Sequence, residues 1–202
     1  CIRDSVNTQI FDTRTGLTNT SLTGQYIAGQ TGININTSAN NAVVIGKPNE
    51  IIADTGSNGT ISYEYSSAGI TVDLTKTTVQ VSGGDASGDC LSGFVNIVGS
   101  CYGDTLTGVG TSTLMGGGGN DTIIGKGADT ASFTGVMADY TVTYDNTKSA
   151  YVVSDSVAGR DGTDTVTNVG YLQFSDQKYI FYNISKTIGT GSSAVSFGTT
   201  AL

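Results

Sequence analysis

The 202-residue sequence contains no histidine and no tryptophan. Without histidine the chain has no means to build a His-ligated zinc site, a Ser-His-Asp triad or a Cys-His pair. Carboxylate-only mechanisms remain open, because they need only two acids that flank a cleft. The spacing of the acids singles out no such pair, so we expect a protein that is not an enzyme.

Charge and long apolar runs are also scarce. Charged residues make up 13% of the chain, and nine basic against seventeen acidic side chains give a net charge of −8. This balance disfavours nucleic acid or an anionic membrane as a partner. No stretch approaches the roughly 20 apolar residues of a membrane-spanning helix. We therefore expect no nucleic-acid partner and no membrane span.

Proline occurs once, whereas glycine occurs 29 times and hydrophobic residues reach 37%. Together with many β-branched residues, this composition predicts an all-β protein with many tight turns. Most acidic residues are aspartates close to glycines, a placement that suits a hard cation such as Ca²⁺, which takes oxygen ligands. An alternative is that the acids only keep an exported protein in solution.

A nonapeptide pattern organises the middle of the chain. Residues 116–124, GGGGNDTII, match G-G-x-G-x-D-x-U-x at every specified position, where U is a large apolar residue. This pattern is typical of calcium-binding parallel β-helix repeats. Imperfect copies follow nearly the same register at residues 84–92, 99–107, 108–115 and 125–132.

Each repeat predicts a sharp glycine loop followed by a short strand whose U residue points into a narrow core. Two repeats form one coil of about 18 residues, so alternate loops stack on the same edge. The spacing places the acidic positions on one edge at Asp89, Asp104 and Asp121, and on the other edge at Asn96, Thr113 and Asp129.

Calcium is expected between stacked loops, where glycine carbonyls and aspartate oxygens converge. The site with the best ligands lies between two loops, through Gly99, Gly103, Asp104, Gly117, Gly119 and Asp121. The other edge has Thr113 in an acidic position and should bind calcium weakly or not at all. Further candidate ligands are Asp89, Gly127, Asp129, Asp161 and Asp164. A plain Asx turn around Asp161 and a glycine-rich solenoid without metal are the alternatives.

Two longer segments resemble a known family. Residues 60–108, with "GITVDL" and "GDASGDCLSGFVNIVGSCYGDTLTG", and residues 128–179 are similar to RTX (repeats-in-toxin) proteins of bacterial type I secretion. The resemblance implies a secreted, extracellular chain with a short parallel β-roll and flanking antiparallel, β-sandwich-like strands. It divides the chain into an N-terminal β segment, the roll, a β-rich capping module and a tail that resembles a secretion signal, at residues 1–45, 46–132, 133–182 and 183–202.

The chain also departs from the family pattern. Phe94-Val95-Asn96 stands where Ile-Glu-Asn is common, and the repeats are few, so the calcium capacity is expected to be small. Cys90 and Cys101 occupy positions where small residues are usual. In the coiled arrangement they fall on adjacent coils, so either a disulfide or unrelated thiols fits. Cys1 in place of a starting Met suggests a processed product or a fragment.

Three functions are compatible with these features. The favoured one is a secreted structural protein that folds on calcium binding and self-assembles, as a homo-oligomer, into a surface layer, matrix or filament. A cell-surface component is compatible as an attachment partner. The alternative is the C-terminal secretion module of a larger exported enzyme, toxin or adhesin. A third is a solenoid that binds ice or carbohydrate through threonine rows, although the rows drift too much for regular Thr-x-Thr ranks.

Overall fold

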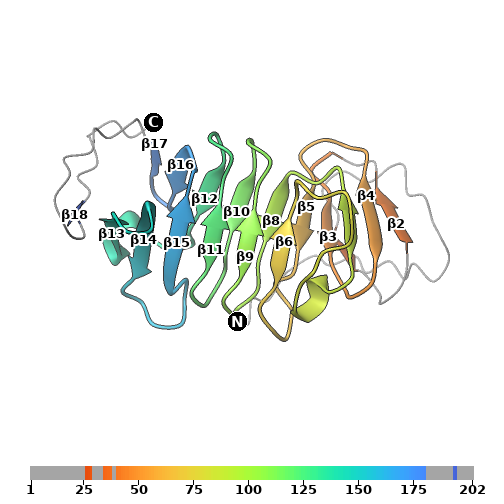
Figure 1. Cartoon of the computed structure of the whole chain (residues 1–202), viewed down its shortest axis with the longest axis horizontal. Coiled ribbons are helices and arrows are strands. Elements are labelled where there is room, and N and C mark those ends of the chain that lie inside the picture. Colours follow the sequence, from red (N-terminus) through yellow and green to blue (C-terminus); the bar gives the residue numbers. More distant parts are fainter. Residues whose placement is uncertain (1–25, 29–33, 38–39, 181–192, 195–202) are drawn as a thin grey trace.

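The computed structural model describes residues 26–28, 34–37, 40–180 and 193–194. Within these ranges the chain contains eighteen short strands and two 3-10 turns, and no α-helix. The strands stack side by side along the long axis of the molecule (Figure 1). The all-β fold with a parallel roll, expected from the glycine repeats, is confirmed.

One face of the roll is an eight-stranded sheet. All neighbouring strands in it are parallel except the last pair. Their order is β1 (Tyr26–Ala28), β3 (Val43–Ile45), β5 (Thr60–Ser62), β8 (Asn96–Val98), β10 (Thr113–Met115), β12 (Thr130–Ser132), β16 (Tyr171–Gln173) and β17 (Lys178–Ile180).

The opposite face consists of two sheets. The three-stranded sheet contains β2 (Asn34–Thr37), β4 (Ile51–Asp54) and β7 (Cys90–Ser92). The seven-stranded sheet contains, in order, β18 (Ser193–Ala194), β13 (Tyr140–Asp145), β14 (Ala150–Asp155), β15 (Thr163–Thr167), β11 (Thr122–Ile124), β9 (Thr105–Thr107) and β6 (Thr71–Asp73). The 3-10 turns are η1 (Gly84–Ala86) and η2 (Met137–Asp139).

The core lies between the two faces. Because side chains alternate along a strand, the middle residue of each three-residue strand points inward and its neighbours point outward. The inward residues are fully or almost fully buried, as predicted for the U positions: Ile61, Val72, Ile97, Leu106, Leu114, Ile123, Ala131 and Leu172. A row of aliphatic side chains thus holds the coils together.

The face with two sheets is divided because the chain inserts an extra segment between β6 and β7. β6 pairs with β9, whereas β7 pairs with β4. Gln80, which is 2% exposed, links the two sheets. Its side chain accepts a bond from Asp73 N at 2.9 Å and donates to Asp73 O at 3.1 Å. Its backbone N donates to Asp89 O at 2.7 Å.

The roll extends past both boundaries predicted from the sequence. Strands β1 to β3 precede residue 46, and they pair with β3, β4 and β5 of the following coils. After residue 132, β15 pairs with β11 and β16 with β12, so a further coil follows the β13–β14 hairpin. The antiparallel strands expected after the roll are present, and they continue its sheets at one end of the molecule (Figure 1).

In the part of the chain that the structure describes, no helix has the length and apolar character needed to cross a bilayer. Cys1 and the predicted tail at residues 183–202, apart from β18, lie outside the described residues.

Candidate metal centre

Three aspartates form a column along one edge of the roll. Asp104 and Asp121 immediately precede β9 and β11 of the seven-stranded sheet, and Asp164 is the second residue of β15. The three residues are 3%, 2% and 2% exposed. Asp104 N donates to Asp121 Oδ1 at 2.8 Å, and Asp121 N donates to Asp164 Oδ1 at 2.8 Å. Each carboxylate therefore lies against the backbone of the preceding coil. We call these three residues the aspartate column.

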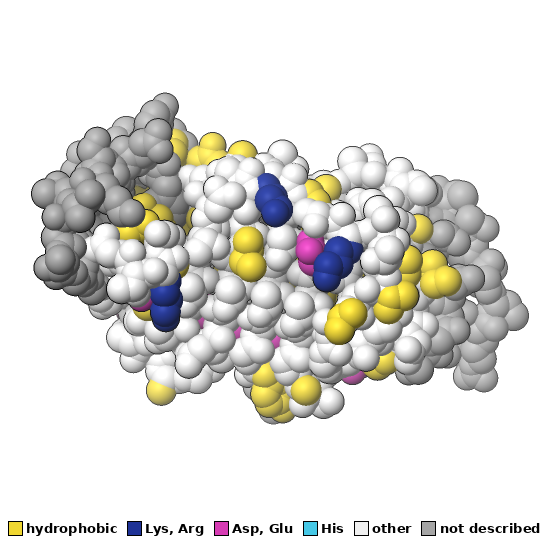
Figure 2. Space-filling view, viewed as in Figure 1, with side chains coloured by type: hydrophobic (Ala, Val, Ile, Leu, Met, Phe, Trp, Pro, Cys, Tyr) yellow, Lys and Arg dark blue, Asp and Glu magenta, His cyan; other side chains and the backbone are white. Residues whose placement is uncertain are grey.

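The local sequence explains why these aspartates are stacked on successive coils. Asp104 and Asp121 are 17 residues apart, which is one coil of the roll. The strand after each begins with a threonine, and Thr105, Thr122 and Thr165 are in register. Acidic atoms are visible in a row across the lower part of the molecule in Figure 2. The loop positions are thus superposed by the register of the strands.

The carboxylates of the column differ in the hydrogen bonds that their oxygens accept. Asp104 accepts bonds from Ile70 N at 2.8 Å and from the Ser100 hydroxyl at 2.8 Å. Asp121 Oδ2 is buried and has no hydrogen-bond partner. A buried carboxylate oxygen without a partner is costly, since it has lost its hydration without compensation. A cation beside this atom would compensate for the lost hydration.

Burial raises the pKa values of the whole column. Burial, partly offset by the bond from Asp104 N, raises the pKa of Asp121 to about 7, and the charges of Asp104 and Asp161 add to the rise. Burial also raises the pKa of Asp164 to about 8, with the charge of Asp121 contributing. The pKa of Asp104 is raised by burial too. The column therefore resists carrying its full negative charge in the absence of a cation.

Glycines allow the loops of successive coils to touch. Gly117 has φ +93°, and a Cβ there would lie 2.1 Å from Ser100 O. A Cβ on Gly99 would lie 2.3 Å from both Asp104 Oδ2 and Gly116 O. The space beside Gly99 is therefore bordered by a carboxylate oxygen and by a carbonyl oxygen of the next coil. Oxygen donors of this kind are the ligands that Ca²⁺ takes.

The structure brings together the six residues assigned to the best site. Gly119 has φ +105°, and a Cβ on it would meet the backbone of Tyr102 at 2.6 Å. A Cβ on Gly103 would lie 2.9 Å from Asn120 O. The loops at residues 99–104 and 116–121 are thus in direct contact. Asp164 joins the same column, although the sequence placed it in a separate module.

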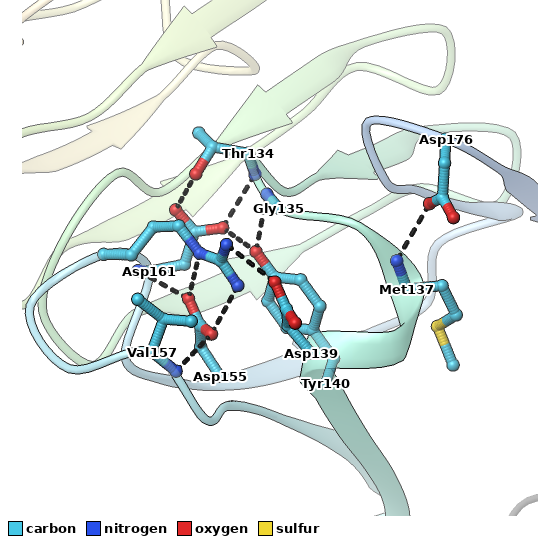
Figure 3. A network of polar contacts seen from close by, with 10 residues as sticks. Thr134, Gly135, Met137, Asp139, Tyr140, Asp155, Val157, Asp161 and Asp176 are labelled. Atoms are coloured by element: carbon cyan, nitrogen blue, oxygen red, sulfur yellow. Dashed lines mark hydrogen bonds and ion pairs between the residues drawn. The ribbon is translucent and has the colours of Figure 1, made fainter.

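Asp161 belongs to a different network, shown in Figure 3. Its Oδ1 accepts the Thr134 hydroxyl at 2.8 Å, and its Oδ2 accepts Thr134 N at 2.7 Å and the Tyr140 hydroxyl. Arg160 pairs with Asp155 at 2.6 Å and with Asp139 at 2.9 Å. Both oxygens of Asp161 are engaged, so this residue holds the chain after β12 against the loop before β15.

Asp89 does not stack on Asp104, and the predicted order of that edge is wrong at this point. β6 intervenes, so Ile70 rather than Asp89 precedes Asp104 in the column. Asp89 accepts Glu50 N at 2.9 Å and the Tyr63 hydroxyl at 2.7 Å. Burial, offset in part by these bonds, raises its pKa to about 6.

On the opposite edge Asp129 is fully buried and satisfied by backbone donors. Its Oδ1 accepts Ser112 N and Gly110 N, and its Oδ2 accepts Lys126 N at 2.6 Å. The residue one coil earlier is Ser112, not Thr113 as the alignment placed it. Thr113 lies on β10 and donates its N–H to Asn96 Oδ1 at 2.9 Å. Gly127, with φ +107°, has open space where a Cβ would be.

Sequence reasoning missed Asp54 at the end of β4. This residue is 5% exposed, and its Oδ2 is buried without a hydrogen-bond partner. Its Oδ1 accepts Gly56 N at 2.9 Å, and a Cβ on Gly59 would lie 1.9 Å from Oδ2. Burial raises the pKa of Asp54. An aspartate followed by Gly56 and Gly59 was the signal, but its spacing departs from the nonapeptide.

No three histidine, cysteine, aspartate or glutamate side chains are grouped closely enough to form a metal site among the residues described. A cation at the aspartate column would therefore need backbone carbonyls beside the carboxylates. Gly116 O and Ser100 O lie at the contact between the two loops. Such a mixed set suits Ca²⁺, which accepts six to eight oxygen ligands in flexible geometry.

Of the two alternatives for Cys90 and Cys101, the structure shows unpaired thiols and no disulfide between them. Both thiols are partly exposed. Cys90 lies on β7, which pairs with β4, whereas Cys101 lies in the loop before β9. Because β6 pairs with β9 and lies between them, the two cysteines are not on adjacent coils.

Threonines form one regular row on the outer face of the seven-stranded sheet. Thr71, Thr105, Thr122 and Thr165 are in register. The second row, two residues later, consists of Asp73, Thr107, Ile124 and Thr167. Paired Thr-x-Thr ranks are therefore interrupted.

A scan against protein-family models and a search of curated proteins find no match to this chain.

Proposed function

We propose that this chain is a secreted, RTX-type calcium-binding β-roll protein whose fold is completed by Ca²⁺ outside the cell. The observation that carries the proposal is the buried, unpartnered Oδ2 of Asp121 within a column of buried aspartates. Burial, with the neighbouring acids contributing, raises the pKa values of Asp121 and Asp164, and a bound Ca²⁺ would stabilise their ionised carboxylates. Metal binding and folding are then coupled, since the loops that supply the ligands are ordered together.

The proposed ligands come from two stacked loops. Asp121 and Asp104 supply carboxylate oxygens, and Gly116 and Ser100 supply carbonyl oxygens at the loop contact. Asp164 continues the column and offers a second position one coil further on. At low calcium the carboxylates repel one another, which suits an exported chain that must stay unfolded, and at millimolar calcium the loops close.

The proposed role is structural, with a second copy of the chain as partner. The outward row of threonines offers a second copy a regular set of hydroxyl groups. Strand edges at the ends of the sheets can also pair with another chain. Assembly into a layer, matrix or filament would follow calcium-dependent folding, because unfolded loops present no regular surface.

The experiment is a calcium titration of chelated full-length protein, followed by far-ultraviolet circular dichroism and light scattering. We expect β-structure to appear at sub-millimolar to millimolar Ca²⁺, with scattering rising afterwards. Asp121→Asn should shift the folding midpoint to higher calcium. Asp145→Asn, at the turn between β13 and β14, is the matched control and should leave the midpoint unchanged.

The outcomes separate the competing functions. Folding followed by scattering supports calcium-dependent assembly. Folding without scattering keeps the calcium role and favours the C-terminal secretion module of a larger exported protein. Full β-structure in chelator, with no response of the melting temperature to calcium, contradicts the proposal, because the glycine loops would then be ordinary turns.

A further inference from the structure

A groove of about 350 Å³ lies where the eight-stranded sheet turns into the loops, and Gly99, Ser100 and Gly117 beside the proposed calcium site form part of its lining. The rest of the lining comes from the ends of β8 and β10, from residues that follow β5, β10 and β12, and from residues 158–161 between β14 and β15. The strands β5, β8, β10 and β12 are neighbours in the eight-stranded sheet. Neighbouring strands are about 4.8 Å apart, so the groove extends about 15 Å along the axis of the roll. It is therefore long and narrow.

The lining combines an exposed aromatic ring with glycine backbone that carries no side chain. Tyr65, which is 55% exposed, borders the groove, and the apolar side chains of Val98 and Met115 contribute to its surface. Gly118 lies in the floor, where a Cβ would sit 3.0 Å from Arg160 O. A flat ring can approach a backbone floor closely, and pockets of mainly apolar lining with few polar groups are typical ligand sites.

One wall of the groove is held in place by the network of Figure 3. Arg160 is fixed by Asp155 and Asp139 and lies over the Tyr140 ring, with its guanidinium carbon 5.1 Å from the ring centre. Asp161, in the same wall, is 4% exposed and bonded to Thr134. A wall that is already ordered loses little entropy when a ligand binds.

Two classes of ligand are disfavoured by the surroundings. A peptide that binds by adding a strand to the sheet would need a free strand edge. The strands β5, β8, β10 and β12 are hydrogen-bonded on both sides. A polyanion would be repelled by the net charge of −8 and by Glu64. Arg160 offers it little attraction, because two aspartates already neutralise the guanidinium.

We propose that this groove binds a linear chain of neutral sugars, with one ring stacked on Tyr65. A pyranose presents an apolar face to an aromatic ring and to side chains such as Met115, and it carries no charge. Its hydroxyls would face Glu64 and the polar wall at Arg160. The site is distinct from the threonine rows, and the inference goes beyond calcium binding.

The test is an NMR titration of the ¹⁵N-labelled full chain in excess CaCl₂ with neutral tri- and tetrasaccharides of glucose, mannose and xylose. We expect at least one to bind, with shift changes confined to residues that line the groove. Tyr65→Ala should weaken that binding about tenfold. Tyr102→Ala removes a tyrosine that is 46% exposed on the same edge but outside the groove, and should leave binding unchanged.

Three results would overturn the proposal: no neutral sugar binds at millimolar concentration, both tyrosine variants lose binding equally, or only a sulfated oligosaccharide or an uncharged octapeptide binds. Circular dichroism checks that both variants remain folded. Repeating the sugar titration in chelator distinguishes the calcium proposal from the sugar proposal. If the protein binds sugar equally in chelator and its folding does not respond to calcium, the calcium site is contradicted and the sugar site is not.

Discussion

Asp121 and Asp164 hold their carboxylates where water has almost no access, and each lies close to another acid. At the scale of single residues, the buried oxygen of Asp121 determines whether this edge of the roll is only a structural hydrogen-bond ladder or can bind a cation. A hydrogen-bond donor there would make the column a purely structural ladder, like Asp129 on the opposite edge. Without a donor, the column favours either a proton or a cation.

The raised pKa values predict how stability depends on pH without metal. An acid whose pKa rises on folding binds its proton more tightly in the folded state, so its ionisation opposes folding. The contribution of Asp121 should be lost between pH 4 and its folded pKa of about 7, and that of Asp164 up to about 8. In chelator, the melting temperature of the wild type relative to Asp121→Asn should fall over this range. A pH-independent difference would contradict the assignment.

Two glycines with similar backbone angles offer a matched comparison. Gly117 and Gly127 have φ of +93° and +107°, but a Cβ meets Ser100 O at 2.1 Å only in the first case. Gly127→Ala should cost about 1–2 kcal/mol of unfolding free energy through backbone strain. Gly117→Ala should cost clearly more, because the neighbouring coil must move. Urea unfolding measures both, and equal losses would show that the loops do not press together as described.

At the scale of elements, the unusual feature is the join between β6 and β7. A side chain replaces backbone pairing there, since the Gln80 amide bonds to both backbone groups of Asp73. Val79 and Val81 on either side are 54% and 82% exposed, so only Gln80 of this stretch enters the interior. Gln80 therefore connects the two sheets on this face through its buried side-chain amide and its backbone N–H.

Replacing that amide tests its role. Gln80→Met keeps the volume but leaves Asp73 N–H without a partner, while Asp73 C=O keeps only the bond from Lys76 N. This should lower the unfolding free energy by about 2 kcal/mol. Val79→Ala, on the exposed side of the same stretch, should change it by less than about 0.5 kcal/mol. Both values come from urea denaturation. Similar small losses for the two variants would mean that water readily replaces the Gln80 bonds.

At the scale of the whole molecule, the coils share one continuous core that ends in an aromatic cluster. Phe133 stacks on Phe174 with ring centres 5.2 Å apart, and Tyr140 packs on Phe174 at 4.9 Å. These rings come from both sides of the β13–β14 hairpin. The hairpin and the last coil are therefore part of the roll rather than a separate module.

Truncation of the chain tests whether the hairpin and the last coil fold as one unit with the roll. A chain ending at residue 132 would lose β15 and β16, the partners of β11 and β12, and would expose Ile123 and Ala131. We expect this chain to lack a cooperative thermal transition in circular dichroism, while the full chain in calcium unfolds in one step. A sigmoidal melt of the truncated chain would instead support an independent roll that ends at residue 132.

The sequence by itself determined the repeating parts of this protein. The short strands, the inward Leu106 and Ile123 and the stacking of Asp104 on Asp121 follow from local backbone preferences and a constant 17-residue spacing. Only the tertiary structure decided where that spacing is broken. Asp164 reaches the column although it is 43 residues from Asp121, because the hairpin is looped out between them. Asp89 is kept from it because β6 enters the stack. Such pairings depend on how inserted segments pack, which a local pattern does not encode.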